Sequence, residues 1–212
     1  MPLADNKYKF DLDDMKSEMY YTLNLCGLTR RLPLCRINEK LMIAAFNMLG
    51  DNELTEAAAS SAYDLIKDVD FDMLVTAECK GIAFTQAVSR LFFERKAQKY
   101  FVVARKSHKL YMNEPVCVSV NSITTEKSQT LWLSGDESKK LKGKKVIIAD
   151  DVISTGETAR ALRFLLGKVG AVVAGELCVL AEGDAFEREG IYYLKYLPIF
   201  DDVGTPIERR QQ

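Results

Sequence analysis

The amino-acid sequence predicts an α/β protein, built on a parallel twisted sheet that is flanked by helices. From about residue 71 onward, short apolar strand patterns alternate with helical patterns, as in parallel strands joined by helical crossovers. Several of these strands are followed directly by charged, hydroxyl-bearing or small residues, and ligands of open α/β sheets bind at that edge. Two further strands, at 115–120 and 129–133, alternate like an antiparallel pair and predict a hairpin.

The length and the charge are those of one ordinary globular domain. The 212 residues carry a formal net charge of -1, which does not favour a nucleic-acid partner. Neither a signal peptide nor an apolar run of membrane-spanning length is visible, so we expect no membrane partner and a cytoplasmic protein. Within the single domain we expect an N-terminal extension at about 1–50, a core at about 51–200 and a polar tail at 201–212.

The cysteines indicate reduced thiols. There are five, an odd number, and no two of them stand at the Cys-x-x-Cys spacing of a zinc or redox site. A disulfide framework and a zinc site are therefore both disfavoured. The residues concerned are Cys26, Cys35, Cys79, Cys117 and Cys178.

The first fifty residues have a less regular pattern. Residues up to about 21 are charged and tyrosine-rich, and we expect them to lie over the main body. Residues 23–35 predict short strands and turns. The spacing after Asn38 predicts a helix that ends at Leu49, with Asn38 as its N-cap. A second helix is predicted from about Glu53, where apolar residues recur at i, i+3 and i+4.

The core elements follow in regular order. Buried strands are recognised by short apolar runs, and helices by a 3.6-residue apolar period that ends at glycine. The predicted elements are strand 73–77, helix 83–91, strand 100–104, a polar loop at 107–114, the paired strands 115–120 and 129–133, a turn at 142–144, a strand from Val146 that ends in two acids, helix 156–169, and strands 171–180 and 191–196.

The stretch from Val146 to Thr158 carries the most unusual chemistry. Its apolar run ends in Asp150 and Asp151, whose mutual repulsion would be relieved by diol hydroxyls or a hydrated Mg²⁺ ion. The hydroxyl-rich turn that follows can surround a phosphate with backbone N–H groups at a helix N-terminus. An ordinary capped helix beside two acids is the alternative that this stretch alone leaves open.

The whole stretch from Val146 to Thr158 resembles the signature with which the type I phosphoribosyltransferases bind 5-phosphoribosyl 1-pyrophosphate (PRPP). Four apolar residues, two acids, three mostly apolar residues and Thr-Gly-x-Thr follow one another in fixed register. Two other segments, each directly after a predicted strand, are similar to segments of the same family; we call such a turn at the carboxyl end of a strand a corner of the sheet. Residues 78–81, Glu-Cys-Lys-Gly, resemble the pyrophosphate loop, which reads Glu-Ser-Arg-Gly in the adenine enzymes. Arg105 and Lys106, followed by a polar loop and the hairpin, resemble the family's basic corner and flexible lid. The resemblance extends over about 23–200.

The resemblance implies a fold with a small N-terminal hood and a β-hairpin lid, a homodimer, and Mg²⁺ as cofactor. It also implies the residues that hold PRPP. For the ribose hydroxyls these are Asp150 and Asp151, with Asp151 reaching the metal through water. For the 5′-phosphate they are Ser154, Thr155, Gly156, Glu157 and Thr158. For the pyrophosphate they are Glu78, Cys79, Lys80, Gly81, Arg105 and Lys109.

The resemblance also implies residues for the base and the chemistry. Glu114 matches the lid glutamate that faces the purine, and Asp151 is expected to be essential for turnover. A solvated loop acid is the alternative for Glu114. The hood over the base is expected near Arg31 and Leu32.

The implied function is transfer of the 5-phosphoribosyl group from PRPP to a purine, with release of pyrophosphate. Enzymes for 6-oxopurines place a lysine after the strand that here ends at Glu182 and Gly183, and its absence favours adenine, which gives AMP. Residues 37–42 also resemble xanthine enzymes, so another purine is an alternative. A non-catalytic regulator that binds PRPP or a nucleotide is a second one, because Glu157 and Lys80 depart from the family pattern.

Overall fold

The computed structural model describes residues 19–97, 99–121 and 128–207. Its centre is a five-stranded sheet in the order β10-β9-β8-β4-β5, and every neighbouring pair is parallel. This confirms the predicted fold class. The strands are β4 (Met73–Ala77), β5 (Phe101–Ala104), β8 (Lys145–Ile153), β9 (Val172–Glu182) and β10 (Ile191–Leu197).

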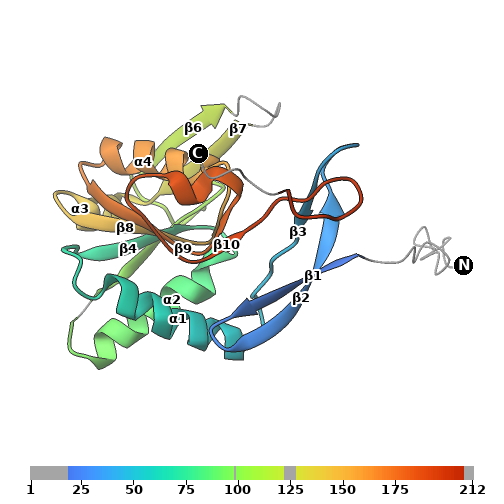
Figure 1. Ribbon diagram of the computed structural model, residues 1–212. Helices are drawn as coiled ribbons and strands as arrows, with labels where there is room; N and C mark the ends of the chain where they lie inside the picture. Colours follow the sequence, from blue (N-terminus) through green and yellow to red (C-terminus); the bar gives the residue numbers. More distant parts are fainter. Residues whose placement is uncertain (1–18, 98, 122–127, 208–212) are drawn as a thin grey trace, which may run out of the picture.

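Helices cover both faces of this sheet (Figure 1). One face carries α1 and α2, and the other carries α3, α4 and the antiparallel hairpin of β6 and β7. The bounds of these elements are α1 Asn52–Ile66, α2 Gly81–Glu94, α3 Gly135–Leu141, α4 Glu157–Lys168, β6 Val116–Asn121 and β7 Ser128–Leu133.

The apolar run of β8 shows why the strands lack polar alternation. Val146 and Ile148 pack into the cluster on the α4 side, whereas Ile147 and Ala149 pack into the cluster on the α1 and α2 side. All four are at most 1 % exposed. Successive side chains of a strand point to opposite faces, so a strand covered on both sides is apolar throughout.

The N-terminal part forms a separate antiparallel sheet, β1-β2-β3, at one end of the molecule (Figure 1). Its strands are β1 (Tyr20–Leu25), β2 (Leu28–Arg36) and β3 (Met42–Ala44). Its buried side chains join the same cluster as α1 and α2, and this anchors the small sheet to the main body. The predicted placement of residues 1–21 lies largely outside the described residues.

The predicted helix over 38–49 is wrong. The Asn38 side chain does accept hydrogen bonds from two backbone N–H groups that follow it, as an N-cap would. Here they belong to a tight turn instead, which returns the chain along β2 as strand β3. Met42 and Ala44 are buried while Ile43 between them is only half-buried, so the period of this segment is two. A short apolar run of this kind fits either period.

Two short elements were not predicted. Helix α3 has a capping box, in which Ser134 accepts from the Glu137 N–H and Glu137 accepts from the Ser134 N–H. A 3₁₀ turn at Gly183–Glu187 follows β9. All five cysteines are free thiols in this structure. None of the helices in the described ranges has both the length and the apolar character of a membrane span.

Candidate active site at the carboxyl edge of the sheet

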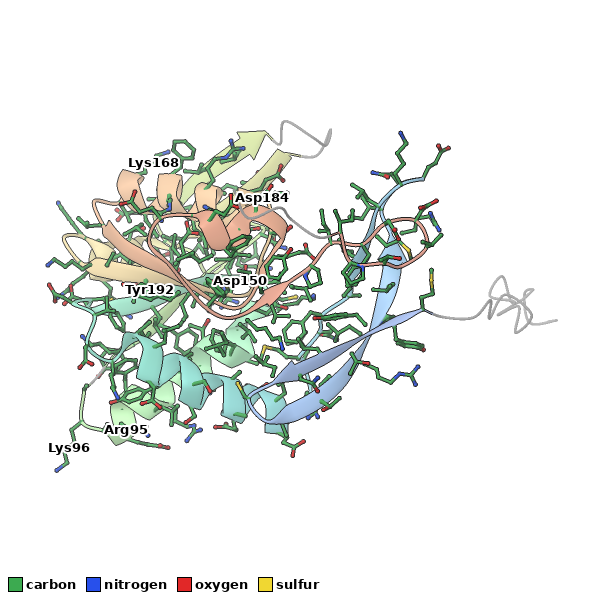
Figure 2. All side chains as sticks on the ribbon, in the orientation of Figure 1. Arg95, Lys96, Asp150, Lys168, Asp184 and Tyr192 are labelled. Carbon is green, nitrogen blue, oxygen red and sulfur yellow. The ribbon has the colours of Figure 1, made fainter. Side chains whose placement is uncertain are left out.

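The acid pair lies on β8, near the middle of the molecule, as the label of Asp150 shows (Figure 2). The strand continues through both acids to Ile153, whereas the sequence pattern suggested that it ends at them. Asp151 is 5 % exposed and Asp150 is partly buried. An Asp150 carboxylate oxygen accepts from the Asp151 N–H at 2.9 Å. Burial, together with the charge of Asp151, raises the pKa of Asp150 to about 7.

One carboxylate oxygen of Asp151 is buried and accepts no hydrogen bond from the described residues. This oxygen is Oδ2, and the Lys80 ammonium lies 3.5 Å away. Buried carboxylate oxygens are ordinarily satisfied, by hydroxyls, by water or by a cation. In the described ranges no three His, Cys, Asp or Glu side chains gather as a metal site. The donor set fits Mg²⁺ held by one or two carboxylates, with its other ligands from water and phosphate oxygens.

The turn after β8 forms a pocket at the N-terminus of α4. Gly156 has a φ of +75°, a left-handed conformation that suits glycine, and α4 begins with Glu157. The unpaired N–H groups of a helix N-terminus make such a pocket suited to an anion. Its lining residues are Asp150, Val152, Ile153, Ser154, Thr155, Gly156, Glu157, Thr158 and Ala159.

The loop between β4 and α2 touches the acid pair. A Cβ added to Gly81 would lie 2.7 Å from Asp150 Oδ1 and 2.7 Å from the Thr76 hydroxyl, so only glycine lets these corners meet. The Glu78–Cys79 peptide bond of this loop is cis. Lys80 Nζ donates to the Phe46 carbonyl at 2.6 Å, which links the loop to the chain that follows β3. The sequence-predicted loop and acid pair thus share one edge of the sheet.

The basic corner after β5 is tied to the same loop through Glu78. One carboxylate oxygen accepts from the Lys106 N–H at 2.9 Å, and the other lies 3.2 Å from Arg105 and 3.9 Å from Lys109. The Lys106 hydrogen bond and these cations lower the pKa of Glu78. Glu78 therefore holds two of the cations predicted around a pyrophosphate, Arg105 and Lys109, whereas Lys80 lies beside Asp151.

A family model described as the phosphoribosyl transferase domain matches residues 48–203. The chain belongs to the phosphoribosyltransferase family. It is 34 % identical over 153 residues to the adenine phosphoribosyltransferase of Thermosipho africanus, over 69 % of this chain and 84 % of that one. It is 36 % identical over 143 residues to the hypoxanthine/guanine phosphoribosyltransferase of Methanotorris igneus, over 65 % of this chain and 72 % of that one.

A solved structure agrees with the fold. The adenine phosphoribosyltransferase of Leishmania donovani superposes with a TM-score of 0.60 over 91 % of this chain and 82 % of that one. At 15 % sequence identity this similarity concerns the fold alone. The predicted resemblance to the phosphoribosyltransferase family is confirmed, and so is the predicted type I fold.

Three residues predicted for the base and the chemistry of a phosphoribosyltransferase lie outside the lining of the pocket after β8. Glu114 is 80 % exposed and pairs with Lys139 of α3 at 3.5 Å. The Arg31 guanidinium stacks on the Tyr20 ring at 4.1 Å, on the N-terminal sheet. Leu32 is 5 % exposed and packs in the core, so its backbone is the part left for a ligand. Their functional roles stay predictions.

Two residues near the pocket were missed by the sequence analysis. Glu182, at the end of β9, is 7 % exposed and its carboxylate accepts from the Ser154 hydroxyl; burial raises its pKa. An acid that ends an apolar strand is the signal that singled out Asp150, and it applies to Glu182 as well. Arg188 follows the 3₁₀ turn and lies against Gly156. No local pattern marks Arg188, because its contact is set by the fold.

Proposed function

We propose that this phosphoribosyltransferase transfers the 5-phosphoribosyl group of PRPP to a purine, and that adenine is the base. The observation that carries the proposal is the contact between Gly81 and Asp150, which joins the loop after β4 to the end of β8, while Glu78 links the same loop to the segment after β5. These corners offer a phosphate pocket, a carboxylate pair and a group of cations. PRPP has a 5′-phosphate, a ribose diol and a pyrophosphate, one group for each corner.

The phosphate pocket and the acid pair are proposed to hold the ribose 5-phosphate part. Backbone N–H groups and hydroxyls of 154–158 donate to the phosphate oxygens, helped by the N-terminus of α4. Asp150 and Asp151 accept hydrogen bonds from the ribose hydroxyls. Asp151, whose Oδ2 is unsatisfied, also holds a water ligand of Mg²⁺.

The pyrophosphate is proposed to lie against Lys80, Arg105 and Lys109, with backbone N–H groups of the 78–81 loop beside it. Glu78 itself would repel a phosphate. Its contacts with Arg105 and Lys109 suggest that it positions these cations instead. Mg²⁺, when bound, neutralises part of the pyrophosphate charge and so makes pyrophosphate a better leaving group.

In the reaction a purine ring nitrogen forms a bond to C1 of the ribose, the bond from C1 to the pyrophosphate oxygen breaks, and the nitrogen loses its proton. Little covalent work is left to the protein, which must orient the two reactants and stabilise the leaving charge. Glu114 is proposed to accept or relay the proton. Because it is exposed in this structure, the proposal requires that the segment after β5 brings it to the base.

Adenine is proposed because the end of β9 presents no lysine to a 6-oxo group. It presents Glu182, and a carboxylate accepts hydrogen bonds from an exocyclic amino group but repels an exocyclic oxygen. Arg31 and the backbone of Leu32 are proposed to lie over the base. A 6-oxopurine is the second candidate, because the relative from Methanotorris igneus is named for hypoxanthine and guanine.

Turnover of the purified protein with PRPP and Mg²⁺ tests the proposal against four bases: adenine, hypoxanthine, guanine and xanthine. We expect adenine to give the highest kcat/KM and the Asp151→Asn variant to lose turnover by orders of magnitude while it stays folded. Binding of PRPP without turnover of any base would instead indicate a regulator that binds PRPP. Faster turnover of xanthine or hypoxanthine would correct the choice of base alone.

The assembly is proposed on the same resemblance, and the location on the sequence pattern and the unpaired cysteines. We propose a homodimer in the cytoplasm, without a nucleic-acid or membrane partner. Light scattering after gel filtration measures the mass directly, and a value near that of one 23.9 kDa chain would contradict the dimer.

A further inference from the structure

An arginine lies against Gly156, one of the residues that line the pocket that we propose for the 5′-phosphate. A Cβ added to Gly156 would meet Arg188 Nη1 at 1.8 Å and its Cζ at 2.6 Å, so the guanidinium packs against the bare Cα of this glycine. Arg188 comes from the segment between the 3₁₀ turn and β10, far along the chain from the pocket. A positive charge therefore lies beside one of the residues that line the pocket.

The charge of Arg188 is incompletely neutralised. Its Nη2 donates to Glu176 Oε1 at 3.2 Å, but the same oxygen accepts from Arg163 Nε at 2.7 Å. Glu176, on β9, is 2 % exposed. Its single carboxylate pairs with both arginines. Arg188 Nη1 is buried without a hydrogen-bond partner among the described residues. Two guanidinium groups thus share one carboxylate oxygen, and Arg188 is the one of the two that lies against Gly156.

Without a ligand, the Arg188 guanidinium is in an electrostatically unfavourable position beside the N-terminus of α4. The N-terminus of α4 is itself the positive end of a helix dipole, and a cation beside it is destabilising. An anion in the pocket is attracted both by the helix N-terminus and by the guanidinium, and these two attractions offset the repulsion between them. The Arg188 side chain is 31 % exposed, so solvent and salt screen part of this effect.

We propose that Arg188 is a positioning residue for the ribose 5-phosphate, which holds Gly156 in its left-handed conformation and supplies positive charge beside the pocket. This inference rests on the proposed function. The guanidinium does not line the pocket, so it acts through the Gly156 backbone and does not contact the phosphate.

The test uses the whole chain and three variants. Arg188→Gln removes the charge, Arg188→Lys keeps it, and Arg163→Gln is the matched control, because it removes the other partner of Glu176. Calorimetry with ribose 5-phosphate and with PRPP measures Kd, and steady-state kinetics separates KM for PRPP, KM for the base and kcat. Thermal unfolding records whether each variant is folded.

We expect Arg188→Gln to raise Kd for ribose 5-phosphate and KM for PRPP at least tenfold, with KM for the base and saturated kcat within threefold. A tenfold change corresponds to about 1.4 kcal/mol. Arg163→Gln should change Kd by less than twofold, and Arg188→Lys by less than threefold. The affinity of Arg188→Gln should also depend less on salt, since salt screens the charge that it lacks.

Other results overturn the inference. If Arg163→Gln weakens binding as much as Arg188→Gln, or if neither changes it, the arginines only stabilise the fold. If Arg188→Gln is unfolded, Arg188→Lys decides: a loss beyond tenfold contradicts a role for the charge, and a loss within threefold supports it. A wild-type protein that binds neither ribose 5-phosphate nor PRPP would overturn the proposed function, whereas tight binding that is unchanged in Arg188→Gln overturns this inference alone.

Discussion

Replacing Asp150 by asparagine should stabilise the ligand-free protein at pH 8. The ordinary pKa of this carboxyl is 3.8, and burial beside Asp151 raises it to about 7 in the folded chain. The folded state then binds more protons than the unfolded state between these two values. Stability contributed by this group is fully present below pH 4 and is lost as the pH rises through 7.

The size of the effect follows from the pKa difference. About three pKa units correspond to an upper limit of about 4 kcal/mol at pH 8. Solvent reaches the partly buried Asp150 and reduces this, so we expect a gain of roughly 1–3 kcal/mol for Asp150→Asn. The amide oxygen can still accept from the Asp151 N–H, which keeps the local hydrogen bond. Turnover should be lost, because the amide cannot replace the carboxylate toward the ribose.

Urea unfolding with EDTA, at pH 4.5 and pH 8, measures the free energy of unfolding for both proteins. The gain should be largest at pH 8 and should fall to about a quarter of that value at pH 4.5. Asp151→Asn is the control, and it should stabilise less because it removes only the neighbouring charge, whereas burial is the larger cause of the shift. It also loses the ion pair with Lys80. A gain that is equal at both pH values, or a loss at pH 8, would refute the reasoning.

Three further predictions concern the site and the fold. Gly81→Ala should destabilise the protein by roughly 1–3 kcal/mol and remove most turnover, since its Cβ would lie 2.7 Å from Asp150 Oδ1; unfolding and steady-state assays check both. An unaffected variant would mean that the two corners do not pack as described. Ser134→Ala should cost about 1 kcal/mol of stability with kcat unchanged, because the capping box of α3 is lost. EDTA should abolish turnover and excess Mg²⁺ should restore it; turnover that continues in EDTA would contradict the metal's role.

The sequence was informative where the pattern is local. Strand β4 matches its predicted bounds, because a short apolar run between polar segments allows one placement. The loop at 78–81 and the acid pair meet because parallel strands bring their carboxyl ends to one edge, which follows from the fold class alone. The contact of Gly81 with Asp150 is the outcome of that rule.

Other features depend on contacts between distant segments. The segment after Asn38 has an N-cap residue and apolar residues, and its strand form is selected by pairing with β2, which the local pattern does not contain. Arg188 lies in an irregular segment, and its place against Gly156 depends on how that segment returns to β10. The base side is the least predictable part, because the exposed position of Glu114 reflects one conformation of a surface segment.

Two buried polar atoms without hydrogen bonds at this edge of the sheet support one ligand more strongly than any sequence motif does. Asp151 has a buried oxygen without a hydrogen bond, 3.5 Å from the Lys80 ammonium, and Arg188 has a buried nitrogen without a hydrogen bond. The two groups are opposite in sign, so no single ion is complementary to both. A molecule with hydroxyl donors and a phosphate dianion is complementary to both, because its hydroxyls can donate to Asp151 and its phosphate is attracted by the charge of Arg188 without contacting it; ribose 5-phosphate is such a molecule. The unfavourable electrostatics of the free protein are thus complementary to the part of PRPP that is transferred.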